Sequence, residues 1–321
     1  MPNDQPIPIR ELPIPALVQK AGRVIAEASQ IILGKEVQIR LSLACLISGG
    51  HLLIEDIPGV GKTTLAQTLA RLLGLSYQRI QFTSDLLPAD IIGASIYERQ
   101  SDGFRFHPGP IFAQLVLADE VNRATPKAQS ALLEAMEERQ VTVDGVTRPL
   151  PQPFFVIATQ NPMHQVGTFP LPESQLDRFL MRIDLGYPGE QAERDLLRGR
   201  NRRELLHALQ AALNAQELLA LRAAAFKLHV SDALLDYLQA VVRYTREAPR
   251  FEAGLSPRAA IALKHAAQAW ALLMGHTGVA PEDLQAVLPG VVGHRLCLKA
   301  THESNSSAAV TRELLEAVPI P

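Results

Sequence analysis

The stretch "DIPGVGKTT", residues 56–64, separates an apolar run from an amphipathic segment. The run "HLLIE" (51–55) before it has the composition of a buried strand, and "LAQTLARLLG" (65–74) after it has apolar residues at helical spacing. A glycine-rich turn between a strand and a helix directs successive backbone N–H groups and the positive helix end at one point. The order of these segments therefore predicts an anion-binding turn.

The residues of this turn match a phosphate-binding loop at most positions. Gly59 and Gly61 allow the backbone to approach a phosphate closely, Lys62 can reach the β and γ phosphates, and the next hydroxyl, that of Thr63, can ligate Mg²⁺. Asp56 stands where the usual pattern has a glycine, but a side chain there can point away from the nucleotide. A glycine-rich turn with a solvated lysine is the alternative. The expected nucleotide-binding residues are Pro58, Gly59, Val60, Gly61, Lys62, Thr63 and Thr64.

Five short apolar runs alternate with helical patterns up to about residue 188. Near-continuous apolar strands separated by helices favour a parallel sheet covered on both faces. From residue 189 onward helical patterns replace the strand pattern, so the fold class is α/β, followed by an all-helical domain. The predicted strands are "HLLIE" (51–55), "YQRIQFT" (77–83), "LVLADE" (115–120), "FFVIATQ" (154–160) and "FLMRIDL" (179–185).

The chain is predicted to divide into four parts. These are a flexible proline-rich tail (1–15), the α/β core (16–188), the helical domain (189–300), and a polar loop with a short C-terminal helix (301–321). Within the core, 94–110 and 139–151 have β-prone residues around glycine-containing turns and are predicted to form hairpins. Within the helical domain, Ser231 is predicted to cap a helix.

Two strand ends carry polar residues suited to catalysis. Asp119 and Glu120 end "LVLADE", and we expect Asp119 to reach the Mg²⁺ shell and Glu120 to act on the attacking water. A solvated acidic pair is the alternative, but the position after a phosphate-binding turn favours the catalytic interpretation. Asn161 ends the strand in "FFVIATQNP" and can hold that water or contact the γ-phosphate, or it can simply form an Asn-Pro turn.

Two arginines are further catalytic candidates. Arg178 precedes the fifth strand in "LPESQLDRF", and Arg258 begins a helix in "GLSPRAAIAL". Each can be an ordinary surface cation. An arginine also neutralises charge on a transferring phosphoryl group, and it can come from the same subunit or from a neighbour.

Composition limits the partners and the location. Lys and Arg total 31 against 33 Asp and Glu, a formal charge of −2, so no nucleic acid partner is expected. The N-terminus lacks the basic and apolar regions of a leader, and the longest apolar run is too short to span a bilayer, so we expect no direct membrane insertion. The chain has 2 cysteines, which favours a reducing compartment. We expect a cytoplasmic protein.

In their order, these motifs resemble those of the MoxR family of AAA+ ATPases. The resemblance runs from about residue 32 to residue 294, and its most specific part is the segment 118–145. The matching segments are "DIPGVGKTTLA" (56–66), "LADEVNRATPKAQSALLEAMEERQVTVDG" (117–145), "FFVIATQNP" (154–162), "GTFPLPESQLDRFL" (167–180) and "LSPRAAIAL" (255–263). They resemble the P-loop, Walker B with its following helix, sensor 1, arginine-finger region and sensor 2 of that family.

The resemblance implies a chaperone-like ATPase that binds and hydrolyses Mg-ATP. It implies a homo-oligomeric ring, expected to be a hexamer, that remodels, assembles or matures a partner protein complex, and a partner protein with a von Willebrand factor A domain. It makes Arg178 a finger that acts on the next subunit's nucleotide and Arg258 the sensor 2 of a lid. It also implies that the two hairpins are insertions facing the pore or surface of the ring.

Two other classes of function stay open. An AAA+ motor or loader acting on nucleic acid is one; the mild negative charge and the lack of a basic arm argue against it, and salt-dependent DNA binding would favour it. A nucleotide-binding scaffold without turnover is the other. The intact set of Lys62, Asp119, Glu120 and Asn161 disfavours a scaffold.

Overall fold

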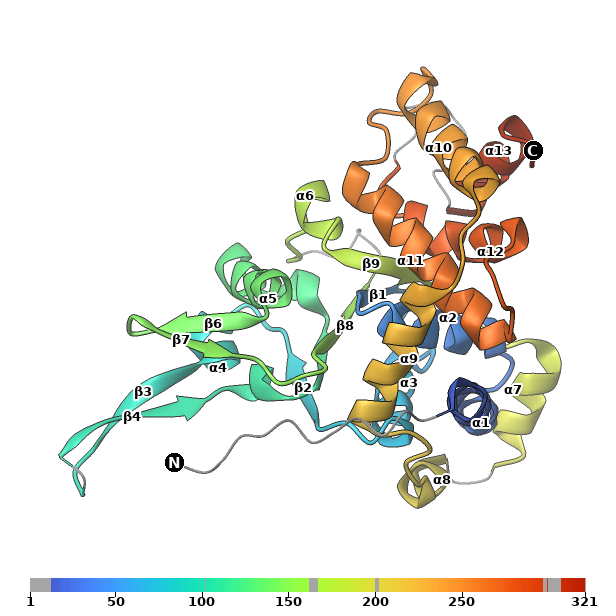
Figure 1. Cartoon of the computed structure of the whole chain (residues 1–321). Helices are drawn as coiled ribbons and strands as arrows, with labels where there is room; N and C mark the ends of the chain where they lie inside the picture. Colours follow the sequence, from blue (N-terminus) through green and yellow to red (C-terminus); the bar gives the residue numbers. More distant parts are fainter. Residues whose placement is uncertain are drawn as a thin grey trace.

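The computed structural model describes residues 13–100, 102–161, 167–199, 202–296, 299 and 307–320. Residues 1–12 of the predicted tail and residues 301–306 of the predicted polar loop lie outside them. Figure 1 shows a sheet-containing core with a group of C-terminal helices packed along one side.

The core is built on a five-stranded sheet with the order β2-β5-β8-β1-β9, and all neighbouring strands are parallel. Every residue of β5 and β8 is buried, as expected for strands covered on both faces. The strands are β1 (His51–Glu55), β2 (Tyr77–Gln81), β5 (Leu115–Asp119), β8 (Phe155–Gln160) and β9 (Phe179–Ile183). Each lies within the run predicted for it, so the prediction of a five-stranded parallel sheet is confirmed.

Alternate residues of each strand face opposite sides of the sheet. In β1, Leu52 and Ile54 belong to the larger apolar core, whereas Leu53 belongs to the smaller one. The helices that contribute to the larger core from the first part of the chain are α1 (Ile14–Ile31), α2 (Glu36–Ile47) and α3 (Lys62–Leu72). Those that contribute to the smaller core are α4 (Pro88–Ile92) and α5 (Pro126–Glu138).

The last part of the chain is helical, as predicted, and completes the larger core. Ser231 accepts a hydrogen bond from the Leu234 N–H, which confirms the predicted cap. The helices after the sheet are α7 (Glu190–Leu197), α8 (Arg202–Ala208), α9 (Ala215–Lys227), α10 (Asp232–Glu247), α11 (Pro257–Met274), α12 (Pro281–Val292) and α13 (Ser307–Ala317). Shorter elements in the core are the 3₁₀ turns η1 (Pro110–Phe112) and η2 (Val121–Arg123) and the helix α6 (Glu173–Leu176).

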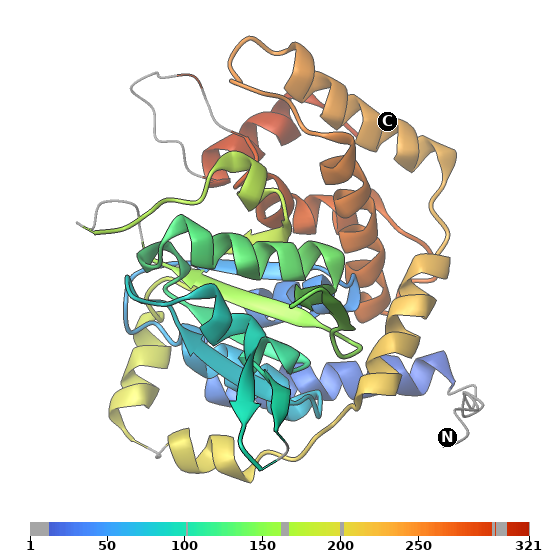
Figure 2. The ribbon, with the colours of Figure 1, turned by 90° about the vertical axis from the view of Figure 1, so that its left-hand side faces the viewer.

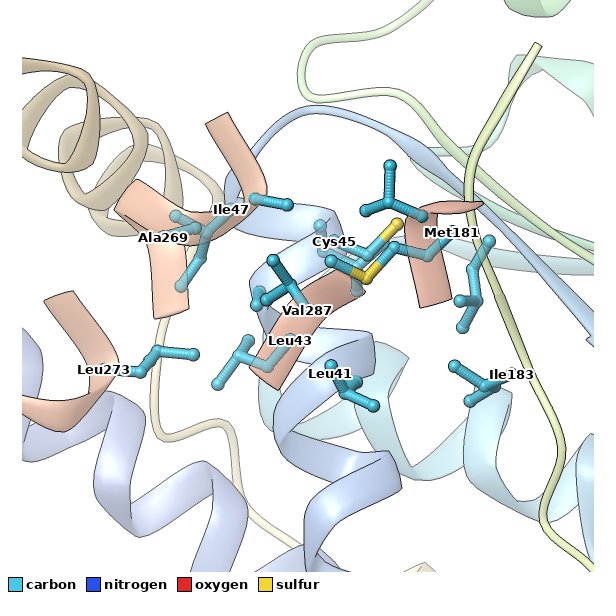
Figure 3. Packing of buried hydrophobic residues seen from close by; sticks show 14 of the residues in the cluster. Leu41, Leu43, Cys45, Ile47, Met181, Ile183, Ala269, Leu273 and Val287 are labelled. Atoms are coloured by element: carbon cyan, nitrogen blue, oxygen red, sulfur yellow. The ribbon is translucent and has the colours of Figure 1, made fainter. Parts of the chain in front are cut away.

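Helix α2 joins the C-terminal helices to the sheet. Its apolar side chains lie between strand β9 and helices α11 and α12, as Figure 3 shows. The residues that meet there are Leu41, Leu43, Cys45 and Ile47 of α2, Met181 and Ile183 of β9, Ala269 and Leu273 of α11, and Val287 of α12. This packing fixes the helical part beside β9, at one edge of the sheet.

Two antiparallel hairpins extend from the core on the side away from the C-terminal helices (Figures 1 and 2). Strand β3 (Gly93–Glu98) pairs with β4 (Gly103–Pro108), and β6 (Gln140–Val143) pairs with β7 (Val146–Pro149). Asp144 and Gly145 have φ of 53° and 74°, the left-handed backbone that a tight two-residue hairpin turn requires. Among the helices described, none is long and apolar enough to cross a membrane.

Candidate nucleotide-binding and catalytic site

The predicted phosphate-binding turn lies between β1 and α3, at the carboxyl edge of the sheet. Gly59 and Gly61 have φ of 88° and 100°, where a residue with a side chain is strained. A Cβ at either position would meet no atom within 4 Å, so the backbone conformation is what requires glycine. Helix α3 begins directly after Gly61, so the unpaired N–H groups of its first turn are available to a phosphate.

A cavity of about 290 Å³ at this edge gathers residues from the ends of three strands. It is lined by Pro58, Gly59, Gly61, Lys62, Thr63, Thr64, Asp119, Glu120 and Asn161. The structure thus brings the predicted carboxylates and the predicted amide to the phosphate-binding turn. The Val60 side chain instead packs against the larger apolar core.

Lys62 is nearly buried at the base of the cavity, with 8% of its surface exposed. Its ammonium donates to Asn161 Oδ1 at 3.0 Å, to the Gln160 carbonyl at 3.5 Å and to the Asp56 carbonyl. Burial lowers the pKa of Lys62. An ammonium that is partly desolvated, and whose partners among the described residues are neutral oxygens, is well placed to bind phosphate oxygens.

Asp56, the departure from the usual loop pattern, points away from the cavity. Its Oδ2 accepts hydrogen bonds from the N–H groups of Leu185 at 2.7 Å and Gly186 at 2.6 Å, and its Oδ1 accepts from Ile57 N–H at 2.7 Å. The carboxylate therefore ties the phosphate-binding turn to the segment that follows β9. A glycine at this position would lack all three bonds.

Asp119 and Thr63 form the corner of the cavity where Mg²⁺ would bind. The Thr63 hydroxyl donates to Asp119 Oδ2 at 3.4 Å, and Thr159 donates to Oδ1 at 2.5 Å. Carboxylate and hydroxyl oxygens are ligands that Mg²⁺ accepts, with phosphate oxygens and water completing its shell. The guanidinium of Arg79 on β2 lies 2.6 Å from Asp119 Oδ2, so the negative charge of this carboxylate already attracts a cation. The donor set therefore fits Mg²⁺.

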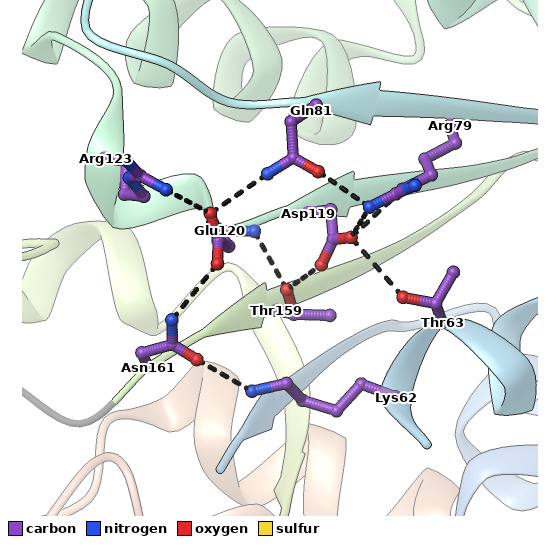
Figure 4. Close-up of polar contacts among 9 residues, drawn as sticks. All are labelled: Lys62, Thr63, Arg79, Gln81, Asp119, Glu120, Arg123, Thr159 and Asn161. Atoms are coloured by element: carbon purple, nitrogen blue, oxygen red, sulfur yellow. Dashed lines mark hydrogen bonds and ion pairs between the residues drawn. The ribbon is translucent and has the colours of Figure 1, made fainter. Parts of the chain in front are cut away.

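Glu120 lies at the mouth of the cavity in a left-handed conformation, with φ of 57°. Its Oε2 accepts from Gln81 Nε2 at 3.0 Å and from Arg123 at 2.8 Å, and its Oε1 accepts from Asn161 Nδ2 at 3.2 Å. Asn161 thus bridges Glu120 and Lys62, as Figure 4 shows. The amide, the carboxylate and the ammonium form one connected network around the cavity.

Arg178 and Arg258 lie together, but not at this cavity. Arg178 is 3.0 Å from one carboxylate oxygen of Glu137, and Arg258 is 3.1 Å from the other. They line a second cavity together with Gly50 and His51, at the amino-terminal end of β1. The phosphate-binding turn follows the carboxyl-terminal end of the same strand. At about 3.3 Å per residue, the five residues of β1 separate the two edges by roughly 15 Å.

Arg258 therefore does not reach the nucleotide cavity of its own chain in this structure. The physical reason is the packing of α11 on α2 and α9, which brings the first turn of α11 to the end of α5. Arg178, in turn, forms its ion pair with Glu137 of α5.

Arg295, which follows α12, holds the segment around Arg178. Its side chain is 6% exposed and pairs with Asp177 Oδ1 at 2.6 Å. It also donates to the carbonyls of Asp177, Phe179 and Leu180 at 3.2, 2.7 and 3.1 Å. The C-terminal helices thus fix the backbone on both sides of Arg178.

Besides Arg295, sequence reasoning missed further charged or polar residues around these two cavities. Arg79 and Gln81 are two residues apart on β2 and so lie on the same face. The sequence of β2 does not indicate that β5 is its neighbour in the sheet. Arg123 and Glu137 lie within the segment 118–145, where no local pattern distinguishes either residue from a charged surface side chain. A polar pair at i and i+2 near a strand's carboxyl end is the signal that could have found the first two.

Comparisons with known proteins agree with the geometry. A family model described as "ATPase family associated with various cellular activities (AAA)" matches residues 51–181, and one for an AAA lid domain matches 243–314. The chain is 44% identical to "Uncharacterized protein YeaC" of Bacillus subtilis, covering 94% of each sequence. It is 41% identical to "Chaperone MoxR1" of Mycobacterium tuberculosis, covering 95% of this chain and 84% of that protein.

A solved structure gives the same result. A protein of Cytophaga hutchinsonii described as a "putative ATPase" superimposes with a TM-score of 0.87 at 38% identity, covering 96% of this chain and 97% of that one. Similarity therefore extends over both the α/β core and the C-terminal helices. The chain belongs to the MoxR family of AAA+ ATPases.

Proposed function

We propose that this protein binds Mg-ATP and hydrolyses its terminal phosphoric anhydride in a ring of subunits, to remodel, assemble or mature a partner protein complex. The observation that carries the ATPase part is the single cavity in which Lys62, Asp119, Glu120 and Asn161 meet the phosphate-binding turn. A scaffold that only binds nucleotide has no need of a carboxylate and an amide held together at the site of the terminal phosphate.

In the proposed reaction, the backbone of residues 58–64 and Lys62 bind the β and γ phosphates. Thr63 and Asp119 would hold Mg²⁺, which neutralises phosphate charge when bound. Glu120 orients the attacking water and accepts its proton, and Asn161 positions Glu120 through the 3.2 Å contact. The places of these residues around the cavity support the proposed roles.

The ring is supported by the positions of Arg178 and Arg258. A guanidinium stabilises the charge of phosphoryl transfer only at hydrogen-bond distance, and both arginines lie at the opposite edge of the sheet from the phosphate-binding turn of their own chain. In a ring, that edge can meet a neighbour's nucleotide. We therefore propose that both arginines act on the neighbouring subunit, in a homo-oligomer of six.

The biological role rests on similarity. The relative named "Chaperone MoxR1" supports a chaperone-like activity on other proteins. We propose a client complex that includes a protein with a von Willebrand factor A domain, and action in the cytoplasm. The two exposed hairpins are the proposed contact elements at the pore or surface of the ring.

Two substitutions test the ATPase. Lys62→Ala should nearly abolish ATP binding, measured by titration with a fluorescent nucleotide, because the phosphates lose their buried cation. Glu120→Gln should keep binding and lose steady-state phosphate release. Arg312→Gln, on α13, is the matched surface control and should change neither property. Unchanged nucleotide binding by Lys62→Ala would show that the cavity is not the nucleotide site.

A further inference from the structure

Arg79 lies on the carboxylate that the metal would use. It projects from β2, the strand beside β5, and places two donors on one oxygen of Asp119: Nε at 3.0 Å and Nη2 at 2.6 Å from Oδ2 (Figure 4). The Asp119 side chain is 8% exposed, whereas that of Arg79 is 47% exposed. A nearly buried carboxylate is thus neutralised by an arginine that has free access to solvent.

The oxygen that Arg79 occupies is the one that faces the metal corner. Thr63 Oγ1 contacts the same Oδ2 at 3.4 Å, while Oδ1 is engaged by Thr159 at 2.5 Å. A carboxylate oxygen has about two lone-pair directions, and here Oδ2 already receives three donors. Coordination of a cation through Oδ2, directly or through a water, therefore requires the guanidinium to withdraw.

Arg79 also has a second partner. Its Nη2 donates to Gln81 Oε1 at 2.7 Å, and Gln81 lies on the same exposed face of β2. A side chain that leaves Asp119 can keep this contact and enter solvent. The exchange therefore needs a side-chain rotation and no change in the sheet.

We propose that Arg79 is a positioning residue that holds and neutralises Asp119 when no metal is present, and that it leaves Asp119 when Mg²⁺ binds with the nucleotide. Metal loading at this site is then a cation exchange. The affinity for Mg²⁺ is lower than the oxygen ligands alone would give, because breaking the pair between Arg79 and Asp119 opposes it. The inference rests on the proposed ATP site.

The test compares nucleotide affinity with and without metal. A fluorescent, non-hydrolysable ATP analogue is titrated in EDTA and in excess Mg²⁺. The dissociation constant in EDTA divided by that in Mg²⁺ reports how much the metal strengthens nucleotide binding on the protein. Arg79→Gln should increase this ratio by about three- to tenfold, as expected for loss of a half-exposed charge pair. Arg79→Lys, which keeps a cation at Asp119, should stay closer to the parent.

A matched control separates this exchange from a general effect of charge. Arg123→Gln removes an arginine that is 53% exposed and paired at 2.8 Å with Glu120, which lines the cavity. The contacts described for Arg123 do not include Asp119. We expect its ratio to equal that of the parent. An equal or smaller ratio in Arg79→Gln, or an equal rise in both variants, would overturn the inference. If the parent fails to bind the analogue at all, it is the proposed ATP site that is wrong.

Discussion

Asp56→Gly gives the phosphate-binding turn the glycine of the usual pattern, and we expect it to weaken the protein. The Asp56 side chain is nearly buried, and its carboxylate accepts three backbone N–H groups, two of them from residues 185 and 186. The bond to the neighbouring Ile57 N–H is local and can persist in an unfolded chain. The other two bonds connect segments about 130 residues apart and exist only in the folded protein.

The expected loss is about 3 to 5 kcal/mol. Hydrogen bonds to a charged group contribute roughly 1.5–3 kcal/mol each, and two are lost. Glycine adds about 0.5–1 kcal/mol through the entropy of the unfolded chain, and water that enters the vacated space offsets part of the total. Asp56→Asn keeps one acceptor oxygen and should lose less.

Urea unfolding measures the loss, and amide hydrogen exchange at Leu185 and Gly186 shows whether it arises at the predicted place. Asp144→Gly is the matched control, because Asp144 is exposed and already has φ of 53°, so glycine there should be neutral or slightly stabilising. A loss below about 1 kcal/mol in Asp56→Gly, with unchanged exchange at both amides, would refute this reasoning.

Two further predictions concern the other edge of the sheet. The free energy of unfolding should fall as the pH drops below about 6.5, because burial lowers the pKa of His51 to about 4 and the unfolded chain therefore binds the proton first. The loss is on the order of 3 kcal/mol by pH 4. Burial also lowers the pKa of His294, which acts in the same direction. The variant His51→Gln can still accept from Val156 N–H and donate to Met136 O. In thermal melts it should lose less stability between pH 7 and 4.5 than the parent protein does. An equal loss would show that His51 is not the source of the pH dependence. Arg295→Gln should lower kcat of assembled protein with little change in KM for ATP, because it releases the backbone on both sides of Arg178. A raised KM with normal kcat would instead place the effect of Arg295 at nucleotide binding.

Much of the core could be predicted because its strands are apolar throughout. A run such as Leu115–Asp119 needs burial on both faces, and a parallel sheet between helices provides it. The turn at residues 56–64 was recognisable because Gly59, Gly61 and Lys62 have roles that few other residues can fill. These are local properties, and the sequence displays them directly.

The contacts that depend on which elements become neighbours could not be predicted. Strand β2 lies beside β5 and so brings Arg79 to Asp119, but periodicity carries no information on strand order. The position of Arg258 depends on how α11 packs against α2. The apolar face of α11 does not by itself select α2, because other apolar surfaces of similar size would also cover it. Asp56 is a third case, because its partners lie on a segment that comes near only when β9 is in place.

A mixing experiment tests most directly whether the active site is completed between subunits. Arg178→Ala subunits keep an intact nucleotide cavity, and Lys62→Ala subunits keep an intact Arg178. Each variant alone should be nearly inactive, since an arginine finger contributes about 10³ to 10⁵ in rate. In an equal mixture, about a quarter of the interfaces combine the intact cavity of one subunit with the intact arginine of its neighbour, so phosphate release should recover to about that fraction of the parent rate. An inactive mixture, or full activity of Arg178→Ala alone as a monomer, would contradict the account.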